Sequence, residues 1–438
     1  MPKRPVQLFS LAVGALAIST LCTTPSFAQR DPQSVTTPVQ TGPGIPKQGP
    51  DNPPDNTELG IPLGSFRLYP VLDLRAGYDS NVFAVQTNQT SSAYFALRPT
   101  LELRSDWSNH MLNAHANGVF GFYTNASTQN YQNVDIGTDG RFDIQRDWYL
   151  TGSVGYARTT EALGTPDVAV ATNPTVQNSI PASIAMYQRF NRLFYQAGAS
   201  VARFSYINFS IPSTSALPSN NRDRTEYNES LRAGYEVYDG WDLWAQGGVN
   251  QRRYIDTFNI ASQNRNSDGW SVTGGSTLEL SGVSKLEGFV GYASQTYQNP
   301  SLTTGAVVFG LGGVWNGYEP LVVRPFLVRS INETAFTNYL NYVSTTIGAE
   351  FTYVVQSEWR LTGGGSFGLA DYTPAPGAVG AFQHTDNFYR ASLGLLYSLR
   401  PQLDIGPLYE FSAGYGPDPA TSPNYTRHII MLRLVARR

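Results

Sequence analysis

The sequence predicts an all-β protein, a closed antiparallel transmembrane β-barrel of about 16–18 strands of the outer-membrane type. Three observations support this fold class. Apolar and polar residues alternate along many segments of strand length, long and short connections alternate between these segments, and no apolar run after residue 28 is long enough for a transmembrane helix. Since lipid offers no partners to backbone polar groups, a chain that crosses with strands must close its sheet.

The composition agrees with a barrel. Of the 438 residues, 14% are charged and 13% are aromatic, with 26 Tyr, 22 Phe and 41 Gly. The mean hydropathy of -0.26 is too polar for a helical membrane protein, but it suits a barrel, in which only alternate residues meet lipid. The net charge of -3 gives no indication of a nucleic-acid partner.

The first 28 residues read as a cleaved signal peptide. Lys3 and Arg4 form a basic start, residues 8–21 are apolar, and the small residues Ser26 and Ala28 predict cleavage after Ala28. An uncleaved membrane anchor is the alternative, but the apolar run is shorter than the roughly 20 residues that a spanning helix needs. The sequence thus implies secretion into the periplasm.

Residues 29–64 are rich in Pro, Gly, Gln and Asn, which predicts a disordered periplasmic linker. The barrel is expected over residues 65–438. The single cysteine, Cys22, lies in the signal peptide, so the mature chain would contain neither a disulfide nor a cysteine metal site.

Eighteen segments show the alternation expected of strands with one apolar and one polar face. In residues 93–104, for example, Phe95 and Leu97 alternate with Arg98 and Glu102. The segment 183–190 is the weakest, and fusion of two weak segments would lower the count to 16. The predicted strands are 65–79, 93–104, 111–123, 131–143, 147–158, 183–190, 193–206, 224–236, 240–252, 267–279, 282–294, 304–315, 320–331, 341–354, 357–370, 386–398, 401–413 and 424–437.

The connections between these segments favour an outer-membrane barrel over a soluble β-sandwich. Long connections such as 159–182 and 207–223 alternate with short ones such as 144–146 and 399–400. Barrels of this kind have short periplasmic turns and longer extracellular loops, so both termini are expected on the periplasmic side. Five of the seven tryptophans lie beside short turns, which predicts a periplasmic aromatic girdle: Trp107, Trp148, Trp241, Trp315 and Trp359.

The polar faces of the strands carry charges of both signs, which would point into the lumen. Such residues either tune the ionic selectivity of an aqueous pore or pair with one another and stiffen the wall, and both roles can hold together. The predicted pore-lining residues are Arg67, Asp73, Arg75, Arg98, Glu102, Arg104, Asp139, Arg141, Arg232, Glu236, Arg324, Glu350, Glu358, Arg360, Arg390, Asp404 and Glu410. Arg433 belongs to the same set.

Two long connections, 159–182 and 207–223, either fold inward and narrow the pore or remain flexible at the surface. The signs of catalysis are few. His384 and Asp386 form an acid–base pair on an outer loop, but the sequence around them lacks a nucleophile motif. We therefore predict no catalytic residue, cofactor or metal site.

The first hairpin reads Arg75-Ala76-Gly77-Tyr78-Asp79-Ser80-Asn81-Val82-Phe83, and the last segment begins Asn424-Tyr425-Thr426-Arg427-His428. Both resemble the opening and closing strands of the type-2 putative beta-barrel porin family. The resemblance covers about residues 65–438 and implies an outer-membrane barrel, with some members associated with exopolysaccharide production. One departure is the C-terminus, Leu434-Val435-Ala436-Arg437-Arg438, which lacks the terminal aromatic residue that commonly guides assembly.

Three hypotheses for function follow. The first is a porin-like passive channel for small hydrophilic solutes, the second an outer-membrane component of exopolysaccharide secretion, and the third a non-conducting structural or surface-interaction barrel. Tyr69 and Tyr94, on the lumen face, could stack on sugar rings, which would suit the second. The expected partners are outer-membrane lipid and lipopolysaccharide, the barrel assembly machinery, and either small solutes or a polysaccharide.

Overall fold

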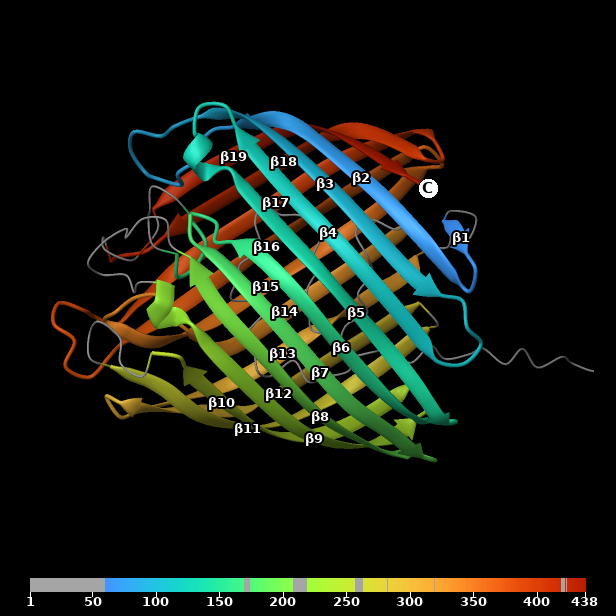
Figure 1. The fold of residues 1–438 in the computed structure, drawn as a ribbon, viewed down its shortest axis with the longest axis horizontal. Helices are drawn as coiled ribbons and strands as arrows, with labels where there is room; N and C mark the ends of the chain where they lie inside the picture. The colour runs from blue at the N-terminus through green and yellow to red at the C-terminus, as the bar shows by residue number, and fades with distance from the viewer. Residues whose placement is uncertain are drawn as a thin grey trace, which may run out of the picture.

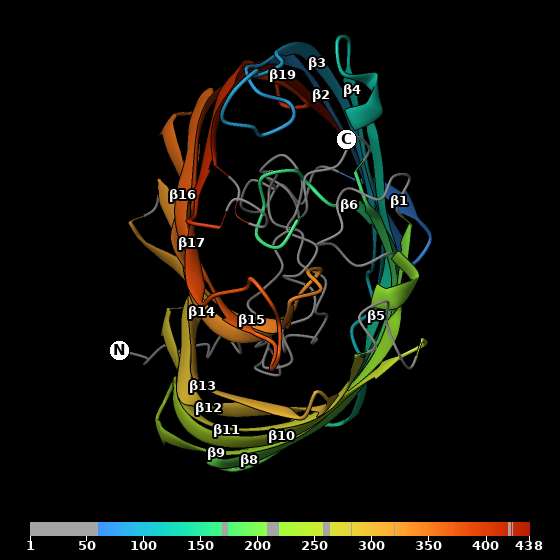
Figure 2. The same cartoon turned by 90° about the vertical axis from the view of Figure 1, so that its left-hand side faces the viewer.

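The strands close into one antiparallel barrel. The computed structural model describes residues 60–168, 174–207, 219–256, 263–281, 283–318, 320–418, 422 and 424–438. Strands β2 to β19 pair in sequence order and β19 pairs with β2, which closes a ring of 18 strands. Figures 1 and 2 show the tilted strands around an oval opening. The predicted fold class is confirmed at the upper end of its strand count.

The regular elements are almost entirely strands. Within the described ranges, helical structure is limited to two short 3-10 turns, η2 (Ser127–Gln129) and η3 (Ser219–Arg222), and no helix there is long and apolar enough to cross a membrane. The strands are β1 (Ile61–Leu63), β2 (Phe66–Asp79), β3 (Ser92–Ser105), β4 (Met111–Tyr123), β5 (Tyr131–Gln145), β6 (Trp148–Thr160), β7 (Val176–Phe190), β8 (Leu193–Ile207), β9 (Arg224–Tyr238), β10 (Trp241–Tyr254), β11 (Asn264–Ser281), β12 (Ser284–Asn299), β13 (Leu302–Tyr318), β14 (Leu321–Glu333), β15 (Tyr339–Gln356), β16 (Trp359–Pro374), β17 (His384–Arg400), β18 (Leu403–Tyr415) and β19 (Tyr425–Arg437).

Each of the 18 predicted segments corresponds to one barrel strand, with most boundaries shifted by one to five residues and two larger differences. The segment predicted at 183–190 begins at Val176, so β7 is about twice as long as expected. Residues Ile61–Leu63, which the sequence placed in the linker, form the short strand β1 and pair with β2. The predicted signal peptide and the rest of the linker lie outside the described residues.

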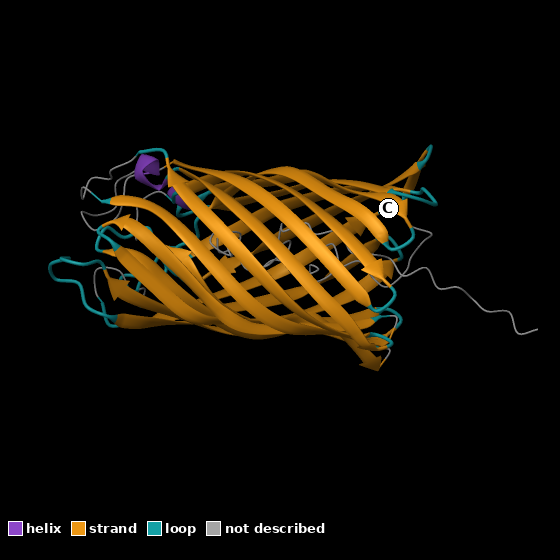
Figure 3. Cartoon of the chain, turned by 90° about the horizontal axis from the view of Figure 1, so that it is seen from below, coloured by secondary structure: helices purple, strands orange, loops and turns teal. Residues whose placement is uncertain are grey.

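The two ends of the barrel differ. At one end, the short-turn end, connections such as 146–147, 191–192 and 401–402 have two residues, and β1 and the C-terminus lie there (Figures 1 and 3). The other, the long-loop end, carries 80–91, 161–175, 375–383 and other long connections, with 300–301 as a short exception. The predicted alternation of connection lengths is therefore present. Trp148, Trp241 and Trp359 begin strands directly after short turns, as a girdle at this end requires.

Alternate side chains face opposite sides of the barrel wall. On β2, Leu72 and Leu74 are each 38% exposed, whereas Asp73 and Arg75 between them are 6% and 5% exposed. This is the reverse of a water-soluble surface, where charged groups are exposed and leucines are buried. The apolar face is outward, where lipid would cover it, and the charged face is inward.

The outward apolar face gives a first prediction. Leu432, in the middle of β19, is 54% exposed, and replacing it by Arg would place a cation in lipid. We expect Leu432→Arg to destabilise the barrel in lipid vesicles, lowering its free energy of unfolding by about 2–4 kcal/mol, as measured by urea titration. The matched change Gln402→Arg, in an exposed turn at the short-turn end, should leave it almost unchanged. Equal effects of the two changes would contradict the assignment of the lipid face.

Candidate functional site

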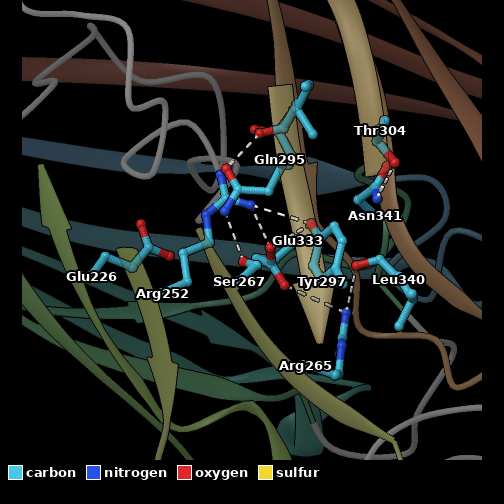
Figure 4. A network of polar contacts seen from close by, with 12 residues as sticks. Glu226, Arg252, Arg265, Ser267, Gln295, Tyr297, Thr304, Glu333, Leu340 and Asn341 are labelled. Carbon is cyan, nitrogen blue, oxygen red and sulfur yellow. Dashed lines mark hydrogen bonds and ion pairs between the residues drawn. The ribbon is translucent and has the colours of Figure 1, made fainter. Parts of the chain in front are cut away.

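A buried ionic cluster inside the barrel identifies the inner face directly. Arg252 on β10 pairs with Glu333 on β14, four strands away around the ring, so the two side chains meet across the interior (Figure 4). Glu333 also accepts hydrogen bonds from the hydroxyls of Tyr254 and Tyr297, the latter at 2.8 Å, and its carboxylate lies 3.7 Å from the Arg265 guanidinium. Arg252, Arg265 and Glu333 are 2–3% exposed.

Strand register extends this inner face around the ring. Arg252 lies opposite Glu226 of β9 and Ser267 of β11, and paired residues in a sheet point to the same side. Followed strand by strand, the register places on the inner face all of the predicted pore-lining residues except Glu358. Glu358 lies exposed in the turn between β15 and β16.

A second ionic cluster lies on the wall where the last strands meet the first. The carboxylate of Asp73 contacts the guanidinium of Arg75 at 2.8 Å, that of Arg433 at 3.0 Å and that of Arg98 at 3.9 Å. Glu410 lies 3.6 Å from Arg75. Among the described residues, these three guanidinium groups thus share the carboxylates of Asp73 and Glu410.

Most other predicted residues also have close partners on the wall. The pairs are Arg104 with Glu102 (2.8 Å), Arg141 with Asp143 (2.5 Å), Arg232 with Glu287 (3.3 Å), Glu236 with Arg189 (3.1 Å), Arg360 with Asp404 (2.7 Å) and Asp139 with the amide of Asn113 (3.2 Å). In register, Arg324 lies opposite Glu350, Arg67 opposite Arg104, and Arg390 between Ser366 and Ser412. This pairing stiffens the wall, which is the structural role that the sequence left open beside the selectivity role.

Several guanidinium groups also stack on inner aromatic rings. Arg232 lies 3.6 Å from the centre of the Trp244 ring, and Arg141 lies 4.0 Å from that of Tyr149. Trp244 therefore belongs to the inner wall and not to the girdle. An aromatic ring attracts a guanidinium that lies over its face, which restricts the position of the guanidinium and the direction of its remaining N–H groups.

Residues 161–168, which follow β6, fold into the mouth of the barrel at the long-loop end, and we call this segment the crossbar (Figure 2). At its start, Glu161 forms two hydrogen bonds with Arg222 of η3, at 3.0 and 2.5 Å. In its middle, the Tyr425 hydroxyl of β19 donates to the Gly164 carbonyl at 2.9 Å. At its far end, the carboxylate of Asp167 accepts hydrogen bonds from the Thr334 hydroxyl and, at 2.6 Å, from the Ala335 N–H.

The far contacts show that the crossbar and the β14–β15 connection together bridge the opening. Its strand, β6, and the strand β15, which follows Thr334 and Ala335, are nine positions apart in a ring of 18 strands. They therefore stand on opposite sides of the barrel. Gly164 allows this close crossing, since it has a φ of +84° and a Cβ there would lie 2.6 Å from the Tyr425 ring.

Two further connections fold inward and pack beside the crossbar. In the connection after β2, Ala84 is buried in an apolar cluster with Leu163, Val168 and Tyr425. In the connection between β14 and β15, Phe336 is 1% exposed, packed against the rings of Tyr339 and Tyr372. The mouth at the long-loop end is thus narrowed by three chain segments that are joined to one another.

Comparison with known proteins identifies the family of the chain. The sequence profile of the family described as "Putative beta-barrel porin 2" matches residues 53–438. The chain belongs to this family. The resemblance of the first and last strands to this family is confirmed, and the family together with the closed barrel makes the protein an outer-membrane porin-like channel.

Among curated proteins no significant sequence match is found. Solved structures that resemble the barrel include OccK9 (OpdG) of Pseudomonas aeruginosa, with 12% identity, a TM-score of 0.43, and coverage of 85% of this chain and 98% of that one. OccAB3 of Acinetobacter baumannii gives 12% identity, a TM-score of 0.43, and coverage of 85% and 99%. A BenF-like porin of Pseudomonas fluorescens Pf-5 has 9% sequence identity and a TM-score of 0.43, with coverage of 86% of this chain and 100% of that one.

The pair His384 and Asp386 lies at the long-loop end in an arrangement unlike that of a hydrolase. The Ser422 hydroxyl donates to Asp386 at 2.5 Å, and the same carboxylate lies 3.8 Å from Nε2 of His384. A hydroxyl nucleophile is activated by a base that takes its proton, usually a histidine held by a carboxylate. Here the carboxylate lies between the hydroxyl and the imidazole, so the cluster ties β17 to the connection before β19.

The described residues contain no group of three or more His, Cys, Asp or Glu placed to hold a metal ion. Sequence reasoning allowed the 159–182 connection to fold inward, and its first part does so. The other connection, 207–223, is described only at Ser219–Arg222 and beyond, where Arg222 holds the crossbar. The inward β14–β15 connection was missed, although its apolar pair Ala335 and Phe336 was a signal, since an exposed loop would rarely carry one.

Proposed function

We propose that the protein is a passive diffusion channel for small hydrophilic solutes, without catalytic activity, in the outer membrane of a Gram-negative bacterium. The observation that carries this proposal is the inner face of an 18-strand barrel, which is lined by paired Arg, Asp and Glu side chains. Barrels of 16–18 strands are wide enough for an aqueous channel, and a wall of both charge signs suits water and polar solutes.

The predicted pore-lining residues other than Glu358 would form the surface that a solute passes. Because most of them are paired, their fields largely cancel, and we expect weak ionic selectivity overall.

The orientation follows from the two ends. Short turns face the periplasm in bacterial barrels, and here the short-turn end also holds β1 and the C-terminus. We therefore propose that both termini are periplasmic, after removal of the signal peptide, and that outer-membrane lipid and lipopolysaccharide cover the apolar face. Neither the family nor the geometry favours the exopolysaccharide-secretion or structural alternatives.

A solute-flux experiment tests the proposal. Liposomes containing the refolded chain 29–438 should swell in a monosaccharide, more slowly in a disaccharide, and no faster than protein-free liposomes in a large dextran. A heat-dependent change in gel migration would establish that the barrel is folded. Swelling equal to that of protein-free liposomes for every solute, with the barrel folded, would rule out a diffusion channel.

A further inference from the structure

We propose that the crossbar, residues 161–168, is a gate of the channel, closed in this structure, and that release of its far end from the β14–β15 connection opens the mouth. The inference rests on the proposed channel function and concerns its regulation. Its basis is that one short segment extends from β6 into the mouth and is held, by contacts other than strand pairing, to a connection that folds inward from the opposite side of the ring.

The three anchors of the crossbar differ in kind. The anchor at its start is ionic, since Glu161 and Arg222 form a bidentate pair and both are buried. The middle anchor is one neutral hydrogen bond from Tyr425. The far anchor includes the hydrogen bonds that the Asp167 carboxylate accepts from two neutral donors, the Thr334 hydroxyl and the Ala335 N–H.

This difference indicates which anchor opens. The bidentate, charge-assisted pair of Glu161 and Arg222 is the strongest of the three contacts, so we expect it to stay formed when the far end is released. Asp167 is 2% exposed and burial raises its pKa, so its contacts do not fully offset the cost of burying its charge. The far end is therefore the point where the balance between a closed and an open crossbar is set.

The environment of Asp167 makes this balance depend on pH. Burial raises its pKa from 3.8 to about 7, against the lowering effects of Thr334, Arg222 and the Ala335 N–H, while Glu161 raises it further. Among the described residues, the charged groups that act on it are Arg222 from η3 and Glu161 from the crossbar itself, and the groups of the β14–β15 connection that contact it are neutral. A protonated Asp167 fits the closed site, because the Thr334 hydroxyl can also accept a hydrogen bond.

The difference between the closed-state and open-state pKa of Asp167 determines in which direction pH shifts the balance between the open and closed crossbar. In an open crossbar Asp167 would be solvated, with a pKa near its usual 3.8, whereas in the closed one the pKa is about 7. A raised acid pKa stabilises the closed form fully below the solvated pKa, and this stabilisation is lost as the pH rises toward the closed-state pKa. The ratio of open to closed channels should thus rise by up to about a thousandfold between these pH values.

The first test uses three variants in planar bilayers, at one pH about 2 units above and one about 2 units below the closed-state pKa. Asp167→Asn keeps both contacts, accepting from Ala335 and donating to Thr334, so its channels should stay mostly closed at both pH values. Asp167→Ala removes both contacts and should stay open at both. Asp371→Asn changes a carboxylate on the outer face at the same end, which contacts Thr385 and Arg329, and should keep the pH response of the unmodified chain.

The second test locks the gate. The only cysteine lies in the predicted signal peptide, so the double variant Asp167→Cys, Thr334→Cys would introduce the only thiols of the mature chain. Oxidation should join the two positions and abolish most of the conductance, and a reductant should restore it. A gel shift would report the disulfide. If the disulfide does not form, the pH responses of Asp167→Asn and Asp167→Ala test the gate on their own.

The outcomes separate the gate from the channel. If the protein conducts and its conductance changes neither with the disulfide nor in the variants, the gate proposal is overturned and the channel function stands. Folded protein that is silent in every variant, including Asp167→Ala, would overturn the gate and the proposed function together. A conductance that falls as the pH rises would also contradict the proposal, since it reverses the sign.

Discussion

Neutralising Glu333 should cause one of the largest losses of stability in the barrel. Its carboxylate holds the guanidinium groups of Arg252 and Arg265, all of them buried, together with two tyrosine hydroxyls. The Glu333→Gln variant would keep the side-chain volume but leave two buried cations without their counter-charge. Removing one partner of a buried ion pair typically costs about 3–5 kcal/mol, which we expect in urea-induced unfolding followed by tryptophan fluorescence.

A matched exposed pair provides the control. Glu279 and Lys285 approach to 2.7 Å near the short-turn end, with side chains 43% and 27% exposed. Because solvent screens such a pair, Glu279→Gln should change the unfolding free energy by no more than about 1 kcal/mol. If Glu333→Gln proved as mild as Glu279→Gln, the interior of the barrel around Arg252 would have to be well hydrated rather than packed.

The second large effect is expected where the first and last strands meet. Asp79 on β2 receives two hydrogen bonds of 3.0 Å from Nε of Arg427 on β19 and a further one from its Nη2, and Arg427 also donates to the Tyr123 hydroxyl at 3.0 Å. Asp79 is fully buried. Asp79→Ala should cost about 3–5 kcal/mol and weaken the closure of the ring, because Arg427 is left charged and buried.

Two measurements check this expectation. Amide hydrogen exchange should rise at Ile430 and Met431, which pair with Tyr78 and Gly77 across the closing seam, more than at residues of β10. The double variant Asp79→Ala, Arg427→Leu should regain part of the lost stability, since no uncompensated charge remains. A double variant less stable than Asp79→Ala would show that the charge pair is not the origin of the loss.

The strands could be predicted because a barrel wall imposes a period of two on the sequence. The main exception, β7, has a physical reason. Its first half contains Asn178, Ser179 and Pro181, which are residues typical of loops, and a proline within a strand argues against that assignment. The flanking strands β6 and β8 supply the pairing for this half, a long-range effect that the local sequence does not contain.

The inner face was predictable, but its contacts were not. Alternation tells which residues point inward, whereas the partner of an inward residue depends on positions around the ring. Arg252 and Glu333 are 81 residues apart, and Asp167 and Thr334 are 167 apart. Such contacts arise from closure and from loops that fold inward, so the sequence predicted a charged lumen without its central cluster or its crossbar.

The most direct test of the channel itself is single-channel conductance of the refolded chain 29–438 in a planar lipid bilayer. The barrel described here predicts steady open steps without any partner protein, which become more frequent as the pH rises toward the pKa of Asp167 and show at most weak ionic selectivity. A correctly folded barrel that shows no steps at any pH, also after the crossbar is released by Asp167→Ala, would contradict the account.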